Sequence, residues 1–143
     1  MSSRTAGEDG GQMIKSTDME NLISAADQAR QKAYAPYSRF HVGAAVLCED
    51  GTVFTGCNIE NASYPVSNCA ERTALFKAVS EGYREFKAIA VVSDAEGFTS
   101  PCGVCRQALS EFCEPELVIY MCGRNRKCRQ TTLGELLPFA FSL

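Results

Sequence analysis

The residues that say most about the architecture of this chain are Ala88-Ile89-Ala90-Val91-Val92, together with Pro101-Cys102-Gly103-Val104-Cys105 further along. An uninterrupted apolar run rich in β-branched residues is typical of a strand that is buried on both faces. Proline is typical of the first turn of a helix. A buried strand followed by a helix is the unit from which α/β proteins are built. We therefore expect residues 88–92 to form an inner strand and residues 101–112 to form a helix against the sheet.

Helical and extended patterns alternate on both sides of this unit. A capping box at Thr17-Asp18-Met19-Glu20 opens a helix that Pro36 stops, and Asp50-Gly51 indicates a hairpin. We further expect strands at 40–48, 52–58 and 117–121, a short strand near Gln130, a helix at 69–81 with Gly82 as its C-cap, and a last short helix that begins at Thr132 and ends at Pro138. This order predicts an α/β protein, a three-layer α/β/α sandwich around a mixed central sheet. Residues 17–143 form its single domain, after a flexible tail at 1–16.

Composition excludes several classes of protein. The length of 143 residues fits one domain, and a formal net charge of −3 disfavours nucleic acid and anionic lipid as partners. Apolar runs fall short of the roughly 18 residues that a membrane helix needs, and the first ten residues do not resemble an export signal. We therefore expect a cytoplasmic protein with neither a nucleic-acid nor a membrane partner. Its eight cysteines are expected to be free or metal-bound.

Three cysteines stand at the starts of two predicted helices: Cys69 opens one, and Cys102 and Cys105 open the other. A helix N-terminus lowers the pKa of a thiol, and successive strand-to-helix turns can lie side by side at one end of a sheet. The three thiolates can therefore converge on one zinc ion and leave its fourth position open, as in catalytic sites. Glu71 is close enough to reach a water on the metal without being a ligand, and Arg72 can donate to the ligand sulfurs.

Other uses of these residues remain open. Cys102 and Cys105 alone are as compatible with redox chemistry or a structural site as with catalytic zinc. Cys113 lies about 12 Å along the helix from Cys105, too far to be a fourth ligand. His41 is predicted to be a packing or surface residue, and the basic run at 124–129 a solvated turn. The other cysteines are interpreted as small apolar fillers or surface thiols: Cys48, Cys57, Cys113, Cys122 and Cys128.

Cys-Ala-Glu-Arg at 69–72 followed by Pro-Cys-Gly-Val-Cys-Arg at 101–106 resembles the small cytidine deaminases that hold zinc with three cysteines. Further matching stretches lie at 36–40 (PYSRF), at 56–62 (GCNIENA) and at 135–138 (ELLP) with Phe141, so the resemblance covers most of the chain from Asp18 onward. It implies the cytidine deaminase-like fold, one Zn²⁺ per chain on Cys69, Cys102 and Cys105, and a homotetramer with shared active sites.

The resemblance also implies a role for each matching residue. Zinc-bound hydroxide would attack C4 of the cytosine ring, while Glu71 would protonate N3 and carry a proton to the departing ammonia. Arg72 would lie behind the zinc ligands. The expected substrate-binding residues are Phe40 against the base, Ala70 at the pyrimidine O2, Ser100 at the amino group, Asn58 and Glu60 at the ribose hydroxyls, Asn61 and Tyr64 in the same substrate-facing run, and Phe141 in a neighbouring subunit's pocket.

The spacing of Asn58 and Glu60 favours a free nucleoside independently. Residues two apart at a strand end share one face. A carboxylate there accepts hydrogen bonds from a diol and repels a phosphate. Together with the resemblance, this predicts hydrolytic deamination of cytidine and deoxycytidine to uridine and deoxyuridine, with release of ammonia, in pyrimidine salvage. The alternatives are another aminopyrimidine nucleoside such as a nucleoside antibiotic, a non-enzymatic zinc-stabilised interaction module, and a redox protein that uses Cys102 and Cys105.

Overall fold

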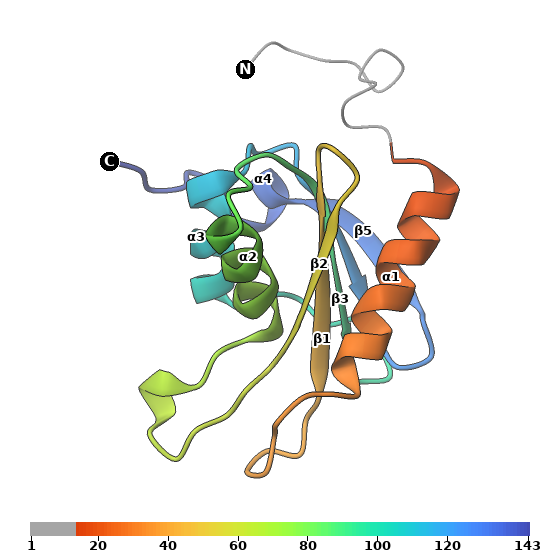
Figure 1. Cartoon of the computed structure of the whole chain (residues 1–143), viewed down its shortest axis with the longest axis vertical. Coiled ribbons are helices and arrows are strands. Elements are labelled where there is room, and N and C mark those ends of the chain that lie inside the picture. Colours follow the sequence, from red (N-terminus) through yellow and green to blue (C-terminus); the bar gives the residue numbers. More distant parts are fainter. Residues whose placement is uncertain (1–13) are drawn as a thin grey trace.

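The structure is a computed structural model that describes residues 14–143, so most of the tail predicted at 1–16 lies outside the described residues. One sheet and the helices around it make up this part of the chain (Figure 1). In chain order the elements are α1 (Ser16–Arg30), β1 (Val42–Cys48), β2 (Val53–Cys57), the 3₁₀ turn η1 (Tyr64–Val66), α2 (Ala70–Ser80), β3 (Phe86–Ser93), α3 (Gly103–Phe112), β4 (Val118–Cys122), β5 (Cys128–Thr132) and α4 (Leu133–Leu136).

The five strands form one mixed sheet in the order β2-β1-β3-β4-β5. Only β3 and β4 pair in parallel, and α3 provides the crossover that a parallel pair requires. The other neighbouring strands are antiparallel, including the hairpin of β1 and β2 predicted from Asp50-Gly51. Helix α1 covers one face of the sheet, and α2 and α3 cover the other (Figure 1). The predicted three-layer sandwich is confirmed, and β5 confirms the short strand expected near Gln130.

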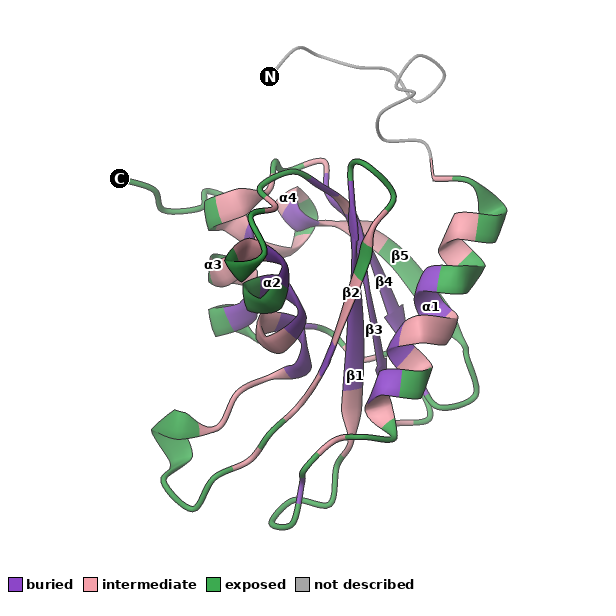
Figure 2. Cartoon of the chain, in the orientation of Figure 1, coloured by how far each residue is buried: buried purple, intermediate pink, exposed green. Residues whose placement is uncertain are grey.

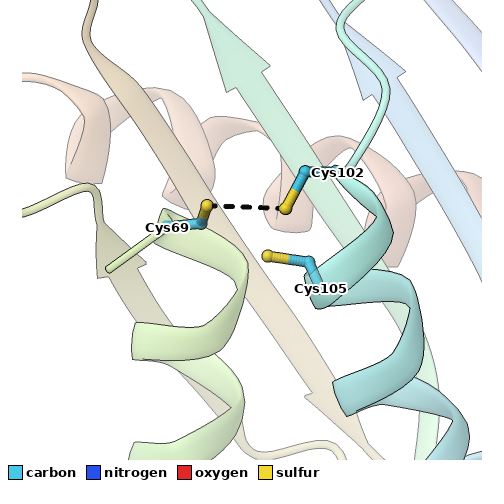
Figure 3. A group of neighbouring side chains, drawn as sticks. All are labelled: Cys69, Cys102 and Cys105. Carbon is cyan, nitrogen blue, oxygen red and sulfur yellow. Dashed lines mark hydrogen bonds between the residues drawn. The ribbon is translucent and has the colours of Figure 1, made fainter. Parts of the chain in front are cut away.

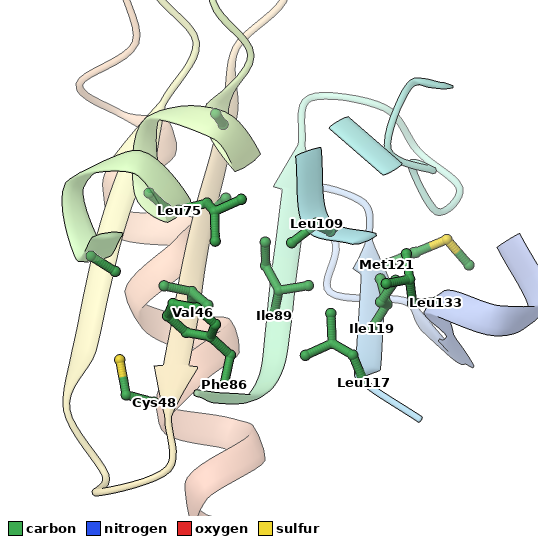
Figure 4. Close-up of a cluster of buried hydrophobic side chains, with 14 residues drawn as sticks. Val46, Cys48, Leu75, Phe86, Ile89, Leu109, Leu117, Ile119, Met121 and Leu133 are labelled. Carbon is green, nitrogen blue, oxygen red and sulfur yellow. The ribbon is translucent and has the colours of Figure 1, made fainter. Parts of the chain in front are cut away.

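The inner strands β1, β3 and β4 are buried on both faces, as the apolar run at 88–92 predicts for β3. On the α2 and α3 side, Ile89 packs with Leu75 and Leu109 (Figure 4). On the α1 side, the alternate residues Ala88 and Ala90 join a second apolar cluster. Because successive side chains of a strand point to opposite faces, one strand supplies both clusters. Figure 2 shows the result, buried inner strands between half-exposed helices, with more exposed strands at the two edges of the sheet.

Glycine at position 56 allows α2 to approach the sheet closely. A Cβ placed on Gly56 would lie 2.4 Å from the backbone nitrogen of Ala74 and 2.8 Å from the carbonyl oxygen of Ala70. Any larger residue would push α2 away from β2. The N-terminus of α2, with Cys69 as its N-cap, is therefore held close to the sheet.

Most predicted boundaries agree with the structure within a few residues, but α1 ends at Arg30 rather than just before Pro36. Residues before a proline disfavour helical backbone angles. Beyond the helix, the Tyr34 N–H donates to the Asn58 carbonyl (3.0 Å), and the Glu60 N–H donates to the Tyr34 carbonyl (2.8 Å). These contacts with a distant segment replace further helical turns. The capping box predicted at the start of the last helix is present at Thr132 and Glu135.

One expectation about the cysteines is wrong. Cys122 and Cys128 form a disulfide, whereas we expected free thiols. The two residues face each other directly in the register of β4 and β5, which brings their Cα atoms to 4.1 Å. Spacing in the sequence does not reveal this strand pairing. Within residues 14–143, none of the helices has the length and apolar character that crossing a membrane requires.

Candidate active site

The three cysteines predicted as metal ligands come together at the N-termini of α2 and α3. Cys69 is the N-cap of α2, Cys102 is the N-cap of α3, and Cys105 lies in the first turn of α3. Their sulfur atoms all lie within 4.8 Å of one another, and the Sγ atoms of Cys69 and Cys102 are 3.7 Å apart (Figure 3). The crossover between β3 and β4 is the tertiary feature that places α3 beside α2.

This geometry fits a zinc ion. Zinc–sulfur bonds of about 2.3 Å in a tetrahedron place the sulfurs about 3.8 Å apart. The separation of 3.7 Å between Cys69 and Cys102 matches that value. Three thiolates occupy three corners and leave a fourth for a reacting molecule, so the donor set is that of a catalytic zinc site rather than a closed structural one.

Arg72 stabilises the negative charge of the cluster. Its Nη2 donates to the Sγ of Cys69 at 3.4 Å, as predicted. The hydrogen bond from Cys105, together with Arg72, lowers the pKa of Cys69 to about 5. Because Cys69 and Cys105 share one proton, the pKa of Cys105 is raised. Burial alone would lower the pKa of Arg72, but its hydrogen bonds to both sulfurs raise it.

Glu71 lies in the first turn of α2 and is only 5% exposed. Burial penalises its charged form and raises the pKa of its carboxyl group to about 7. A carboxyl group that exchanges its proton near neutral pH is suited to general acid–base catalysis. Since the three cysteines already provide the metal ligands, Glu71 is free to act on a bound molecule.

A cavity of about 300 Å³ opens next to the cysteines and Glu71. This volume is at the lower end of the range for small-molecule pockets. It brings together most of the residues predicted for the substrate and adds Ser38, Val42 and Thr99, which the sequence analysis missed. Only Ser38 had a signal in the sequence, because it lies within the matching stretch at 36–40. The lining residues are Ser38, Phe40, Val42, Asn58, Glu60, Cys69, Ala70, Glu71, Thr99, Ser100 and Cys102.

Three of the residues predicted to bind the substrate lie outside this cavity. The Asn61 side chain accepts a hydrogen bond from the Ser63 N–H (2.9 Å), so it organises the loop that follows β2. Tyr64 is 81% exposed. Phe141 lines a separate cavity of about 250 Å³ near the C-terminus, and its carbonyl accepts a hydrogen bond from Gln107. A contribution of Phe141 to a neighbouring subunit stays a prediction.

His41 and the basic run at 124–129 make their contacts away from the cysteines. The Nδ1 atom of His41 lies 2.8 Å from Asp94, in keeping with a packing or surface role. In the basic run, Arg124 pairs with Glu96 at 2.7 Å and Arg126 with Asp27 at 3.1 Å. These partners neutralise part of the positive charge that a polyanion would need.

With this geometry in view, comparisons with known proteins are informative. A model described as "Cytidine and deoxycytidylate deaminase zinc-binding region" matches residues 16–121. The chain is 56% identical to a cytidine deaminase of Sporosarcina psychrophila over 87% of its own length and 92% of that protein. It is 31% identical to a blasticidin-S deaminase of Bacillus cereus over 90% of its own length and 95% of that protein.

A solved structure agrees with these relatives. The crystal structure of cytidine deaminase from Burkholderia pseudomallei superposes with a TM-score of 0.83 at 55% identity, covering 85% of this chain and 98% of that one. The family model spans both cysteine-bearing helices, and the three cysteines agree with the zinc-binding character of the family. This chain belongs to the cytidine deaminase family of zinc-dependent deaminases.

Proposed function

We propose that this protein hydrolyses free cytidine and deoxycytidine to uridine and deoxyuridine and releases ammonia. The observation that carries the proposal is the position of Glu71, which is buried beside the three-cysteine cluster in the wall of a nucleoside-sized cavity. The identity of 56% to a cytidine deaminase over most of the chain supports the same reaction.

Zinc held by Cys69, Cys102 and Cys105 supplies Lewis-acid activation of water. In the reaction a C4–O bond forms and the C4–N bond breaks. Glu71 carries the two protons of the attacking water in turn: one goes to the ring N3 and the other to the amino group that leaves as ammonia, so the carboxyl group ends in its starting state. Burial of Glu71 favours its protonated form and raises its pKa in the metal-free protein, which suits a group that must both hold and release a proton.

The other wall residues orient the nucleoside. In the proposed pose, the Ala70 N–H donates to the pyrimidine O2, the Ser100 carbonyl faces the amino group, and Phe40 packs on the base. The Asn58 side chain already donates to the Phe40 carbonyl (2.8 Å) and accepts from the Val42 N–H (2.9 Å), so one amide hydrogen remains for the ribose.

Glu60 favours a nucleoside over a nucleotide. Hydrogen bonds from Ser38, first among several causes, hold the pKa of Glu60 below its ordinary value, so this carboxylate is charged at neutral pH. It accepts hydrogen bonds from ribose hydroxyls and repels a nearby phosphate.

We propose a homotetramer with shared active sites, working in the cytoplasm in pyrimidine salvage. Several exposed aromatic side chains support burial against other subunits, among them Tyr37, Tyr64, Phe139 and Phe141. The pairing of Arg124 and Arg126 with acidic residues supports a small-molecule substrate rather than nucleic acid.

The second candidate substrate is a nucleoside antibiotic that carries an aminopyrimidine. The identity of 31% to a blasticidin-S deaminase supports this second hypothesis, whereas the identity of 56% to a cytidine deaminase favours the first. Neither a non-enzymatic zinc module nor a redox protein requires a buried glutamate beside the cysteines, so both hypotheses are less well supported than a deaminase.

The test is cytidine turnover, followed by the loss of absorbance as cytosine becomes uracil, with zinc content measured on the same sample. We expect turnover of cytidine and deoxycytidine at one zinc per chain. Zinc-loaded protein that converts blasticidin S and neither pyrimidine nucleoside would support the second candidate. Zinc-loaded protein inactive on all three compounds would contradict both.

A further inference from the structure

The segment between α1 and β1 forms one rim of the cavity, and Ser38 lies in that rim. No individual role is predicted for Ser38 from the sequence. Its side chain is exposed, so ordinary packing does not explain its contacts. Those contacts run to Glu60 and Phe40, two residues proposed to bind the nucleoside.

Glu60 is held almost entirely by this rim. The backbone N–H groups of Tyr37 and Ser38 donate to Oε1 at 2.9 and 3.2 Å. The Ser38 hydroxyl donates to Oε2, the other oxygen of the same carboxylate. A carboxylate has about four acceptor positions, so these donors leave about one for a ligand and set the direction in which it points.

The Ser38 oxygen also accepts a hydrogen bond, from the Phe40 N–H at 3.0 Å. The Phe40 carbonyl in turn accepts from the Asn58 side chain at 2.8 Å. Glu60, Ser38, Phe40 and Asn58 thus form one continuous hydrogen-bonded chain around the mouth of the cavity. Arg39, between Ser38 and Phe40, has a φ of 59°, a left-handed conformation that is uncommon outside glycine and gives the segment its sharp turn.

A hydroxyl group is needed for this arrangement because it donates one hydrogen bond and accepts another at the same atom. Alanine at position 38 would free Oε2 of Glu60 and leave the Phe40 N–H to water. The backbone bonds to Oε1 would remain, so the carboxylate would stay in the rim but rotate more freely. Threonine would preserve both bonds.

We propose that Ser38 is a positioning residue that orients the Glu60 carboxylate toward the sugar of the nucleoside. The inference rests on the proposed function, since it assumes that Glu60 contacts the ribose. Ser38 acts on nucleoside binding and leaves the zinc site and the proton transfers of Glu71 unchanged, because its contacts end at the rim.

The experiment compares Ser38→Ala, Ser38→Thr and the control Ser80→Ala, which removes an exposed serine hydroxyl that bonds only within α2. The substrates are cytidine and 2′,3′-dideoxycytidine, which lacks both hydroxyls that Glu60 could bind. We expect Ser38→Ala to raise the KM for cytidine roughly tenfold, the effect of a lost hydrogen bond to a charged group. The kcat and the zinc content should stay within twofold of wild type, and Ser38→Thr and Ser80→Ala should both resemble wild type.

Two further comparisons test whether Ser38→Ala raises the KM for cytidine through its contact with Glu60. Ser38→Ala should change the KM for dideoxycytidine less than twofold, and it should add less than twofold to the KM of a Glu60→Ala variant. An unchanged KM for cytidine would overturn the proposal. So would an equal loss on both substrates, an additive loss in the Glu60→Ala variant, or a loss accompanied by lower zinc content.

Failure of the proposed function is distinguishable from failure of this inference. Calorimetric binding of uridine, the expected product, reports on Ser38 without turnover. Wild-type protein that binds uridine without deaminating cytidine contradicts only the activity, and the effect of Ser38→Ala on the Kd for uridine still decides the inference. Wild-type protein that neither binds uridine nor deaminates cytidine overturns both.

Discussion

Replacing Glu71 by glutamine tests two properties of this residue: its part in catalysis, and the loss of folding stability caused by burying its charge. The amide has nearly the same shape as the carboxyl group but neither ionises nor transfers a proton. Glu71 is 5% exposed, and burial raises its pKa from the ordinary 4.5 to about 7. A difference of that size corresponds to about 3 kcal/mol between the two protonation states.

The direction in which the free energy of unfolding changes with pH follows from which state, folded or unfolded, holds the proton on Glu71. The folded protein keeps the proton on Glu71 up to about pH 7, whereas the unfolded chain releases it near 4.5. The free energy of unfolding contributed by this group is therefore highest below pH 4.5, falls as the pH rises to about 7, and stays low above it. Glutamine has no such fall. Metal-free Glu71→Gln should be more stable than metal-free wild type by about 3 kcal/mol at pH 8.

Urea unfolding at pH 5 and pH 8 measures this difference on protein stripped of metal, because a bound cation would stabilise the charged carboxylate. The matched control is Glu111→Gln, the same chemical change at an exposed position of α3. In the zinc-loaded protein, Glu71→Gln should retain one zinc per chain and lose activity on cytidine by roughly 10²–10⁴-fold, the usual contribution of a general acid–base group.

Two results would contradict the roles assigned to Glu71, one concerning its proton transfer and the other its buried charge. Turnover near the wild-type rate would show that Glu71 does not carry the proton. An equal pH dependence of stability in wild type and Glu71→Gln would show that its burial does not penalise the charge.

Three other changes test separate parts of the structure. Glu60→Ala should raise the KM for cytidine at least tenfold with unchanged zinc content, since it removes a sugar acceptor that is not a metal ligand; steady-state kinetics with an unchanged KM would count against the ribose role. Arg72→Ala should weaken zinc binding about tenfold or more, because the guanidinium no longer donates to Cys69; competition with a chromophoric chelator measures this, and equal affinity would contradict it. Serine at both Cys122 and Cys128 should lower the free energy of unfolding by about 2 kcal/mol, because a short covalent ring is opened in the unfolded chain. Urea unfolding checks this prediction, and equal stability would argue against the disulfide.

Local patterns in the sequence were sufficient for several elements whose physical cause lies in neighbouring residues. The capping box predicted at Thr17 is wrong, because α1 begins at Ser16 and its N-cap Lys15 makes no side-chain capping hydrogen bond. The apolar run at 88–92 predicts a strand buried on both faces, and the capping box at Thr132 predicts the start of α4; the structure has both. Likewise, Cys69 and Cys102 stand at helix N-termini because each precedes a helical pattern. Local signals could not predict where α1 ends. The residues after the helix are held in a non-helical conformation because Tyr34 forms backbone hydrogen bonds with Asn58 and Glu60, which are distant in the sequence.

Side-chain type, local propensity and short spacings were enough to predict the order of strands and helices, the three cysteines that suit a zinc ion, and the glutamate beside them. The folded chain was needed to show that Cys122 bonds Cys128, that Phe141 lies away from the cavity beside the cysteines, and that Ser38 holds Glu60. Each of these depends on which strands and loops become neighbours in space, and that is set by packing the whole sheet and its helices together.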